Sequence, residues 1–210
     1  MKKLMAIAAI VGLVSCGNDQ SDKGQAAEDT TSQAVPGGAS TAASGRSMMA
    51  IMQDNLNQMK QVESTGNPDN DFAALMKVHH MGAVEMAQEE LAAGTDPEIK
   101  QMAEQMISEQ QKEIAELNTF LSGHQAHGGG DAFYKAVMSQ MNDMKMDMHD
   151  SGSVDRQFVQ MMIPHHQHAI DMSKKYLSTG AHEPKMKEMA NKMIKDQQQE
   201  INDMKAWLEK

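Results

Sequence analysis

The sequence contains little cysteine, few aromatic residues and few of the residues that make turns. Its 210 residues include 1 Cys, 5 Pro and 15 Gly, and only 3% of them are aromatic. The single cysteine, Cys16, excludes an intrachain disulfide and a thiolate metal site in the folded part. Pro and Gly are too sparse for an all-β protein with many turns. No apolar run reaches the ~18 residues of a membrane-spanning helix, which argues against a polytopic membrane protein.

Positive charge is also in short supply, whereas methionine is abundant. Lys and Arg number 19 against 29 Asp and Glu, so the formal net charge is −10. Such an acidic chain is not expected to bind nucleic acid, because it has too few cations to neutralise phosphates. The 23 methionines must supply much of the apolar mass that aromatic residues do not.

The N-terminus has the pattern of a secretory signal. Residues 1–16, MKKLMAIAAIVGLVSC, combine a basic start, a short apolar stretch and small residues before Cys16. The end of this segment resembles a bacterial lipobox, which implies lipidation of Cys16; the alternative is an ordinary signal peptide with an incidental cysteine. Residues 17–46 are rich in Gly, Ser, Thr, Ala and Gln, and predict a disordered tether. We therefore expect a lipoprotein anchored to a membrane of the bacterial cell envelope, periplasmic or surface-facing.

The rest of the chain is a duplicated helical unit. Residues 72–94 align with 158–180 at a constant offset of 86, and 99–121 align with 186–208 at an offset of 87. Neither copy can bury its apolar stripe alone, so the two copies are expected to share one core. The two repeats span residues 47–123 and 131–210.

Each repeat predicts a helical hairpin, because its apolar residues recur at helical spacing. The first turn carries Gly94 and Pro97, a helix-ending glycine and an early-helix proline, and the second repeat has the same pair. Two hairpins with matching apolar faces most simply close into an antiparallel four-helix bundle. Short helices near 47–63 and 132–149 would lie at the ends or sides of this all-α bundle.

The inward helix faces carry histidine, methionine and carboxylate at one depth. Folding each hairpin about its turn sets Glu113 level with the first His-His pair and Glu200 level with the second. The candidate metal ligands on these faces are His79, His80, Met86, Met106 and Glu113 in the first repeat, and Met161, Met162, His165, His166, His168, Met172, Met193 and Glu200 in the second.

A purely structural interpretation competes with the metal site. Methionine at helical spacing commonly fills a core, and a buried His–Glu pair can satisfy itself. Two features favour a metal site. The His-His pair with its Met and Glu occurs in both repeats, although nearby surface positions differ. The second repeat also has Met161 and His168 where the first has Leu75 and Gly82, which is more than packing requires.

A methionine-rich segment, residues 138–149, reads MSQMNDMKMDMH and cannot turn every thioether toward one core. Soft thioethers suit Cu(I), and imidazole suits both Cu(I) and Cu(II), so copper is the expected metal and Cu(I) its expected state. The alternative is a methionine-rich amphipathic helix without metal. His124, His127 and His182 lie in or near turns and are expected to be solvated. The candidate ligands of the segment are Met141, Met144, Met148 and His149.

The doubled pattern Phe-x6-His-His-x5-Met, followed by Gln-x-x-Glu-Ile, resembles a bacterial secreted family known as domain of unknown function 305. The likeness covers about 72–121 and 158–208. It implies a ferritin-like helical bundle and a periplasmic role, with copper binding and copper tolerance proposed for some members. The first copy departs from the pattern, with Val78 in place of the usual proline. By position, the family motif falls on His79, His80 and Met86, and on His165, His166 and Met172.

Three functions compete at this level. The first is a copper-binding lipoprotein that buffers, sequesters or delivers copper, in the last case to a copper-transfer protein. The second is a ferritin-like metal-dependent oxidase that uses iron, although di-iron bundles need about four inward carboxylates and two Glu-x-x-His pairs. The third is a metal-free helical interaction module. We predict the first. No catalytic residues are assigned, because the sequence contains no recognisable nucleophile motif.

Overall fold

Six helices make up the part of the chain that the structure, a computed structural model, describes: residues 45–143, 152–180 and 182–210. Within these residues there are no strands, and no helix combines the length and apolarity that a membrane span requires. The prediction of an all-α protein with two long hairpins is confirmed. The helices are α1 (Met48–Lys60), α2 (Pro68–Ala93), α3 (Pro97–Gly123), α4 (Ala132–Asp143), α5 (Val154–Ser178) and α6 (Pro184–Leu208).

The turns between the paired helices form where the sequence places glycine and proline. Asp96 caps α3 by accepting two backbone N–H groups of its first turn. Gly180 has the left-handed conformation that glycine permits, with φ +100°. Gly94 does not, because its φ is −68°. Glycine is needed there for space instead, since a Cβ atom would lie 2.0 Å from Glu90 Oε1.

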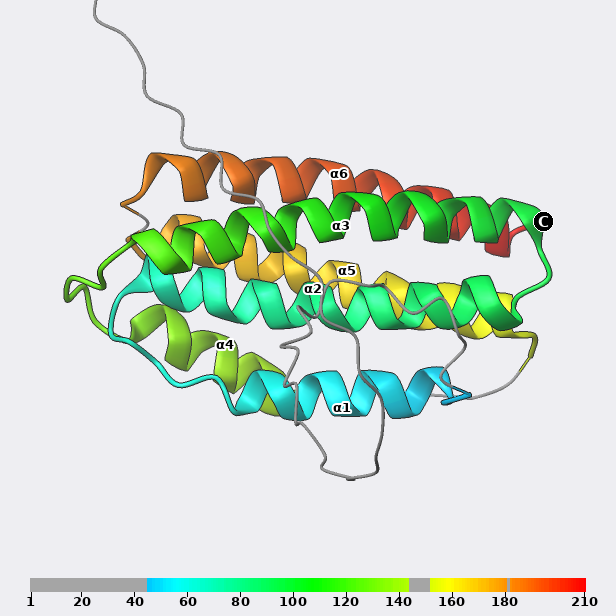
Figure 1. Cartoon of the computed structure of the whole chain (residues 1–210), viewed down its shortest axis with the longest axis horizontal. Coiled ribbons are helices and arrows are strands. Elements are labelled where there is room, and N and C mark those ends of the chain that lie inside the picture. Colours follow the sequence, from blue (N-terminus) through cyan, green and yellow to red (C-terminus); the bar gives the residue numbers. More distant parts are fainter. Residues whose placement is uncertain (1–44, 144–151, 181) are drawn as a thin grey trace, which may run out of the picture. The chain divides into compact units, whose positions relative to one another are not determined.

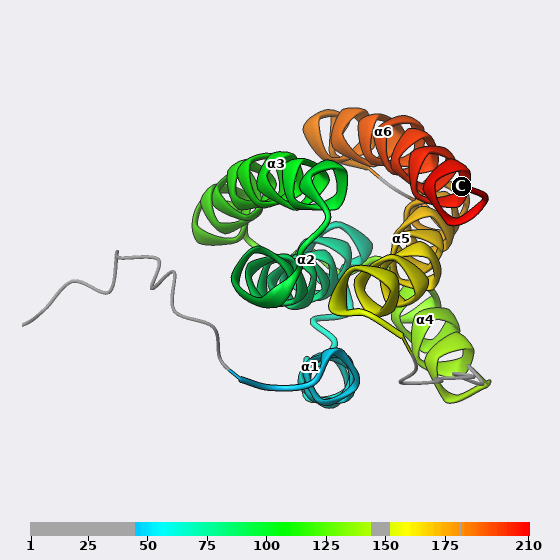
Figure 2. The ribbon, with the colours of Figure 1, turned by 90° about the vertical axis from the view of Figure 1, so that its right-hand side faces the viewer.

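The helices form three layers of two (Figures 1 and 2). Helix α3 pairs with α2 in one hairpin, and α6 pairs with α5 in the other. The second helices of the hairpins, α3 and α6, form one outer layer, and α2 and α5 form the middle layer. Helices α1 and α4 cover the opposite side of α2 and α5. All six helices lie in one compact unit, Ser40–Lys210. The short helices therefore pack along the side of the long ones, and α2 and α5, which carry the His-His pairs, are enclosed from both sides.

Methionine fills much of the core, and the few aromatic residues gather in one cluster. Phe72 stacks on Tyr176 with ring centroids 4.2 Å apart, and Phe133 meets both rings edge-on. All three side chains are fully buried. Since they come from α2, α5 and α4, the aromatic cluster joins both repeats.

Asp155, near the start of α5, holds the turn between α2 and α3. Its carboxylate accepts the backbone N–H groups of Thr95 and Asp96, both at 2.7 Å. Burial opposes ionisation of this group, but the backbone hydrogen bonds from Asp96 and Thr95 outweigh burial and lower the pKa of Asp155 to about 2. A charged carboxylate of the second repeat thus fixes the turn of the first.

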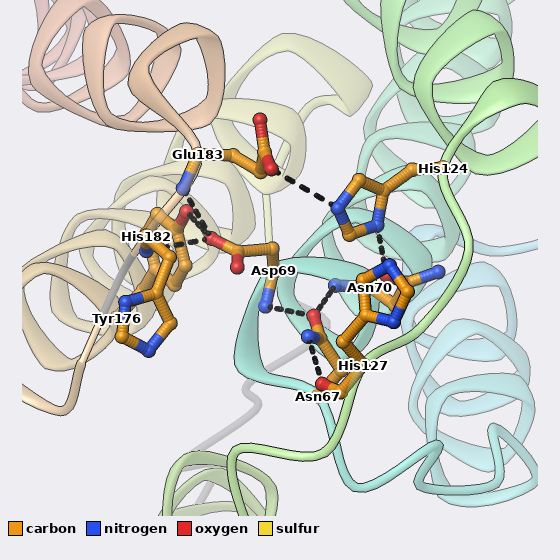
Figure 3. A network of polar contacts seen from close by, with 8 residues as sticks. All are labelled: Asn67, Asp69, Asn70, His124, His127, Tyr176, His182 and Glu183. Carbon is orange, nitrogen blue, oxygen red and sulfur yellow. Dashed lines mark hydrogen bonds and ion pairs between the residues drawn. The ribbon is translucent and has the colours of Figure 1, made fainter.

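Asp69 does the same for the other repeat, from the matching place 86 residues earlier (Figure 3). It accepts the backbone N–H groups of His182 and Glu183, at 3.0 and 3.1 Å, and the hydroxyl of Tyr176. The two contacts are reciprocal, because each repeat's first long helix holds the other repeat's turn. They set the relative position of α2 and α5, and hence of the His-His pairs.

Ring nitrogens join the outer helices at both ends. At one end, His124 contacts the carboxylate of Glu183 through Nε2 at 3.1 Å and Asn70 Oδ1 through Nδ1 at 2.7 Å (Figure 3). At the other end, Trp207 Nε1 donates to Asp96 Oδ2 at 3.2 Å. Glu183 and Asp96 are the N-cap residues of α6 and α3 and correspond in the duplication, whereas the rings that contact them come from positions that do not correspond.

Candidate metal centre

Three buried histidines from the two repeats meet between α2 and α5; we call His79, His165 and His168 the histidine cluster. The ring centroid of His79 lies 3.7 Å from that of His165 and 5.3 Å from that of His168. The three residues are 1%, 4% and 4% exposed. The sequence leaves open whether the repeats form one site or two, and the geometry brings histidines of both repeats together in one cluster.

Most ring nitrogens of the histidine cluster have no hydrogen-bond partner. Both nitrogens of His79 and His165 and Nε2 of His168 are buried and unpaired. Such atoms are rare in folded proteins, because each costs free energy. Burial lowers the pKa of all three rings, to about 4 for His168, and neighbouring histidines lower those of His79 and His165 further. The rings are therefore neutral at pH 7, which is the state that binds metal ions.

The second histidine of each His-His pair faces a carboxylate on the neighbouring outer helix. His80 Nε2 donates to Glu113 Oε2 at 2.9 Å, and His166 Nε2 lies 2.6 Å from Glu200 Oε2. In both rings Nδ1 is buried without a partner. A metal-binding histidine typically directs its other nitrogen to a carboxylate, and the His80–Glu113 pair has this arrangement. His166 Nε2 lies close to Glu200 but forms no hydrogen bond with it. The predicted level of Glu113 and Glu200 beside the His-His pairs is confirmed.

Glu113 is held more firmly than Glu200. Lys192 Nζ lies 3.0 Å from Glu113 Oε1 and 2.9 Å from Asp196 Oδ2. Burial raises the pKa of Glu113, but the hydrogen bonds and charges of His80 and Lys192 outweigh burial, and the net effect lowers it. The Glu200 side chain is 26% exposed, against 11% for Glu113. The two carboxylates thus lie at corresponding positions along their helices but differ in exposure and in their partners.

Thioethers accompany the histidine cluster on both middle helices. On α5, Met161 and Met172 each lie four residues from a cluster histidine, which places them on the same stripe of the helix. On α2, Met86 lies two turns after His79. All three methionines are buried. Imidazole and thioether are therefore the donors that this part of the core offers.

The histidines alone do not form a ready-made coordination shell. Across residues 45–143, 152–180 and 182–210, no group of three or more His, Cys, Asp or Glu side chains is arranged to hold a metal ion. The rings of His79 and His165 are inclined by only 34°. Imidazole lone pairs lie in the ring plane, so these two rings do not aim at one point. A bound ion requires thioether donors or a rotated ring.

The first repeat has no counterpart of His168, and the position of α1 gives the reason. Gly82 stands at the matching position, and a Cβ atom there would lie 2.2 Å from Asn55 Cγ. The side chain of Asn55 is fixed, because its Nδ2 donates to the carbonyl oxygen of Val78 at 2.7 Å. The space that a side chain takes in the second repeat is filled by α1 in the first.

Replacing Gly82 by alanine is expected to lower the free energy of unfolding by about 1–3 kcal/mol, the usual cost of overpacking a filled core. Denaturant unfolding followed by circular dichroism measures it. Gly123→Ala is the matched control, because it also changes a helical glycine but a Cβ atom there meets nothing within 4 Å. Equal losses in the two variants would show that the contact with Asn55 does not restrict this position.

The remaining predicted ligands divide into two groups. One group is buried in the helices around the cluster, and the other lies outside the described residues. The buried group comprises Met106 on α3, Met141 on α4, Met162 on α5 and Met193 on α6. The second group comprises Met144, Met148 and His149, and the predicted lipidation site, Cys16, also lies outside the described residues.

The prediction of solvated turn histidines was correct for two of three residues. His127 and His182 are exposed. His124 is only partly buried, but both of its nitrogens have partners, Asn70 and Glu183, so the prediction was wrong for it. The reason is that α3 ends beside the start of α6. The sequence of the turn alone does not show that these two helix ends are neighbours.

Sequence reasoning missed four residues that shape the site. Asp69 and Asp155 could have been found, because both are acidic and lie at the constant offset of 86. Lys192 and Asn55 have no such signal. Their roles depend on which helices become neighbours, and the first repeat has Gln105 where the second has Lys192.

The chain is thus an all-α protein of two helical repeats whose buried histidines meet in one core. It belongs to the family described as Domain of unknown function (DUF305), which matches residues 18–121 and 122–208. The family resemblance of the doubled His-His motif is confirmed. Each matched segment contains one long hairpin, and the first begins within the predicted tether.

Solved structures of a protein named CopM are similar to this chain. The Ag-bound form is 28% identical with a TM-score of 0.52, and covers 67% of this chain and 95% of that one. The Cu(I)-bound form is 29% identical with the same TM-score and coverage. "Uncharacterized protein L153" of Acanthamoeba polyphaga mimivirus is 42% identical over 55 residues, which are 26% of this chain and 36% of the viral protein. The match therefore spans about a third of that protein's length.

Proposed function

We propose that this chain binds copper and serves in copper buffering, sequestration or delivery. The observation that carries the proposal is the histidine cluster, with neutral, buried imidazoles from both repeats and unpaired ring nitrogens. Buried methionines accompany it on both middle helices. Thioether donors favour Cu(I), whereas imidazole accepts either oxidation state, so Cu(I) is the preferred form.

The similarity to CopM supports the same proposal. Structures of that protein are described as Ag-bound and Cu(I)-bound, and they cover two thirds of this chain. Both are soft monovalent cations. The donors that accompany the histidine cluster here, thioether and neutral imidazole, are those that soft cations prefer.

In this role copper is cargo, and we assign no catalytic step. A ferritin-like iron oxidase is less well supported, because di-iron bundles use about four carboxylates and two Glu-x-x-His pairs. At the depth of the cluster, the described residues offer Glu113 and Glu200, and neither begins such a pair. A metal-free interaction module would leave the buried, unpaired ring nitrogens unexplained.

The proposal includes a place in the bacterial cell envelope. The signal-like segment 1–16 and its lipobox-like end support a lipid anchor on Cys16. Outside the cytoplasm, methionine is a practical copper ligand because it does not form disulfides. The net charge of −10 favours the approach of cations, and delivery would require a copper-transfer protein as partner.

The test is an anaerobic Cu(I) titration of the purified chain against a chromophoric competitor, beside the variant Met161→Leu/Met172→Leu. Leucine keeps the volume of methionine and removes the sulfur. We expect the variant to bind Cu(I) at least about tenfold more weakly, which is the usual effect of losing a group that supports a metal site. Its affinity for Cu(II) should be almost unchanged. Met204→Leu, a buried methionine of α6, is the control.

Two results would contradict the proposal in different ways. Absence of competitive Cu(I) binding by the unmodified chain would refute copper binding itself. Tight binding that is unchanged in the double variant would show that Met161 and Met172 are not ligands and would move the copper to other donors, such as the histidines alone or the methionine-rich segment 138–149.

A further inference from the structure

A groove lies between the two outer helices, α3 and α6. Its volume is about 890 Å³, and acidic side chains outnumber basic ones in its lining. Both Glu113 and Glu200 belong to that lining. The opposite side of α2 and α5 is covered by α1 and α4. The groove is therefore where solvent comes nearest to the carboxylates that contact His80 and His166.

Lys192 of α6 reaches across this groove to α3. Its Nζ lies 3.0 Å from Glu113 Oε1, while Glu113 Oε2 accepts the hydrogen bond from His80. Both oxygens of Glu113 are thus engaged, one by the core and one by the lysine. The Lys192 side chain is 53% exposed and also pairs with Asp196 on its own helix. It can release Glu113 without disturbing the core and without losing its second partner.

The repeats differ at this position. Gln105 occupies the place in α3 that Lys192 occupies in α6, 87 residues later. Both side chains line the groove. An amide cannot form the ion pair that a lysine forms, so Glu200 lacks the lysine partner that Glu113 has. One of the two His–carboxylate pairs is therefore covered by a lysine, and the other is not.

We propose that copper enters and leaves the histidine cluster through the groove between α3 and α6, and that Lys192 controls its passage through the ion pair with Glu113. The inference rests on the proposed function. Release of Lys192 frees an oxygen of Glu113 beside His80, in a groove whose charge attracts cations. A cation that enters there meets first the carboxylate of Glu113 and then the imidazole of His80.

The test measures both directions of transfer in the full chain. Stopped-flow mixing under anaerobic conditions follows Cu(I) uptake by the copper-free protein, and release from the loaded protein to an excess of chromophoric Cu(I) chelator. A gate changes both rates by one factor and leaves the affinity unchanged. In Lys192→Gln we expect both rates to rise about three- to fivefold, because that factor corresponds to the free energy of a partly exposed ion pair.

Two lysine variants separate the ion pair from charge and from the side chain's bulk. Lys185→Gln removes the same charge from the same groove, but Lys185 forms no ion pair with the described residues. Its release rate should equal that of the unmodified chain. Lys192→Arg keeps a cation opposite Glu113 and should also behave like the unmodified chain.

The duplication supplies a test in the opposite direction. Gln105→Lys places a lysine opposite Glu200, at the position that corresponds to Lys192. We expect it to slow uptake and release by a similar factor. This variant keeps the inference testable if Lys192→Gln proves poorly folded, which circular dichroism would show.

The outcomes are distinct. If Lys192→Gln and Lys185→Gln speed uptake equally and leave release unchanged, the groove only attracts cations and the gate is refuted. If no variant changes either rate although the chain binds Cu(I), entry through the groove is refuted while the proposed function stands. If the chain binds no Cu(I), the proposed function fails first and this inference with it.

Discussion

Replacing His79 and His165 together by leucine is expected to weaken Cu(I) binding at least about 100-fold and to stabilise the copper-free protein. Loss of supporting groups alone costs a metal site up to about 100-fold, and these two rings are candidate ligands. In the copper-free state their four nitrogens are buried and unpaired. Apolar side chains of similar size remove that penalty, so the free energy of unfolding should rise by about 1–3 kcal/mol.

The measurements are competitive Cu(I) titration and thermal unfolding without copper. His127→Leu/His182→Leu is the matched control, because it replaces two exposed histidines outside the cluster. It should change neither quantity appreciably. If the cluster variant is instead markedly less stable and binds Cu(I) normally, the buried histidines serve packing, and the metal site lies elsewhere.

Replacing Glu90 by glutamine is expected to stabilise the protein by about 2–3 kcal/mol at pH 7. Glu90 is fully buried, and burial followed by the charge of Asp155 raises its pKa to about 8. The folded protein thus holds a proton that the unfolded chain releases above about pH 4.5. The stability of the unmodified protein should therefore fall as pH rises from about 4.5 to about 8, and glutamine removes that dependence.

Denaturant unfolding at several pH values tests this expectation. At pH 4 the Glu90→Gln variant and the unmodified chain should be about equally stable, because Glu90 is then mostly protonated in both states. Glu104→Gln, which alters an exposed glutamate of α3, should show no such pH-dependent gain. A constant difference between the Glu90 variant and the unmodified chain from pH 4 to pH 8 would contradict the raised pKa.

Much of the fold and part of the site can be read from the duplication. Counting residues from each turn placed Glu113 and Glu200 beside the His-His pairs, and the contacts of 2.9 and 2.6 Å confirm that placement. Local periodicity and turn residues suffice for this, because a hairpin pairs positions equidistant from its turn.

Contacts between the hairpins could not be predicted in the same way. The approach of His79 to His165 depends on how α2 crosses α5, and no spacing within one repeat contains that information. The same holds for Lys192, which reaches a carboxylate of the other repeat. The proposal of copper as the metal rests on donor chemistry rather than on geometry.

The reciprocal contacts of Asp69 and Asp155 bear on how a single repeat could exist. Each aspartate satisfies backbone groups of the other half, so an isolated repeat would expose its turn and leave its own aspartate unused. Two identical copies related by a two-fold axis would restore both contacts, because such an interface pairs one surface with itself. In that arrangement one polypeptide with a single repeat would build the same histidine core as a homodimer. Gene fusion would then have freed the two halves to diverge, as Gly82 and His168 have done.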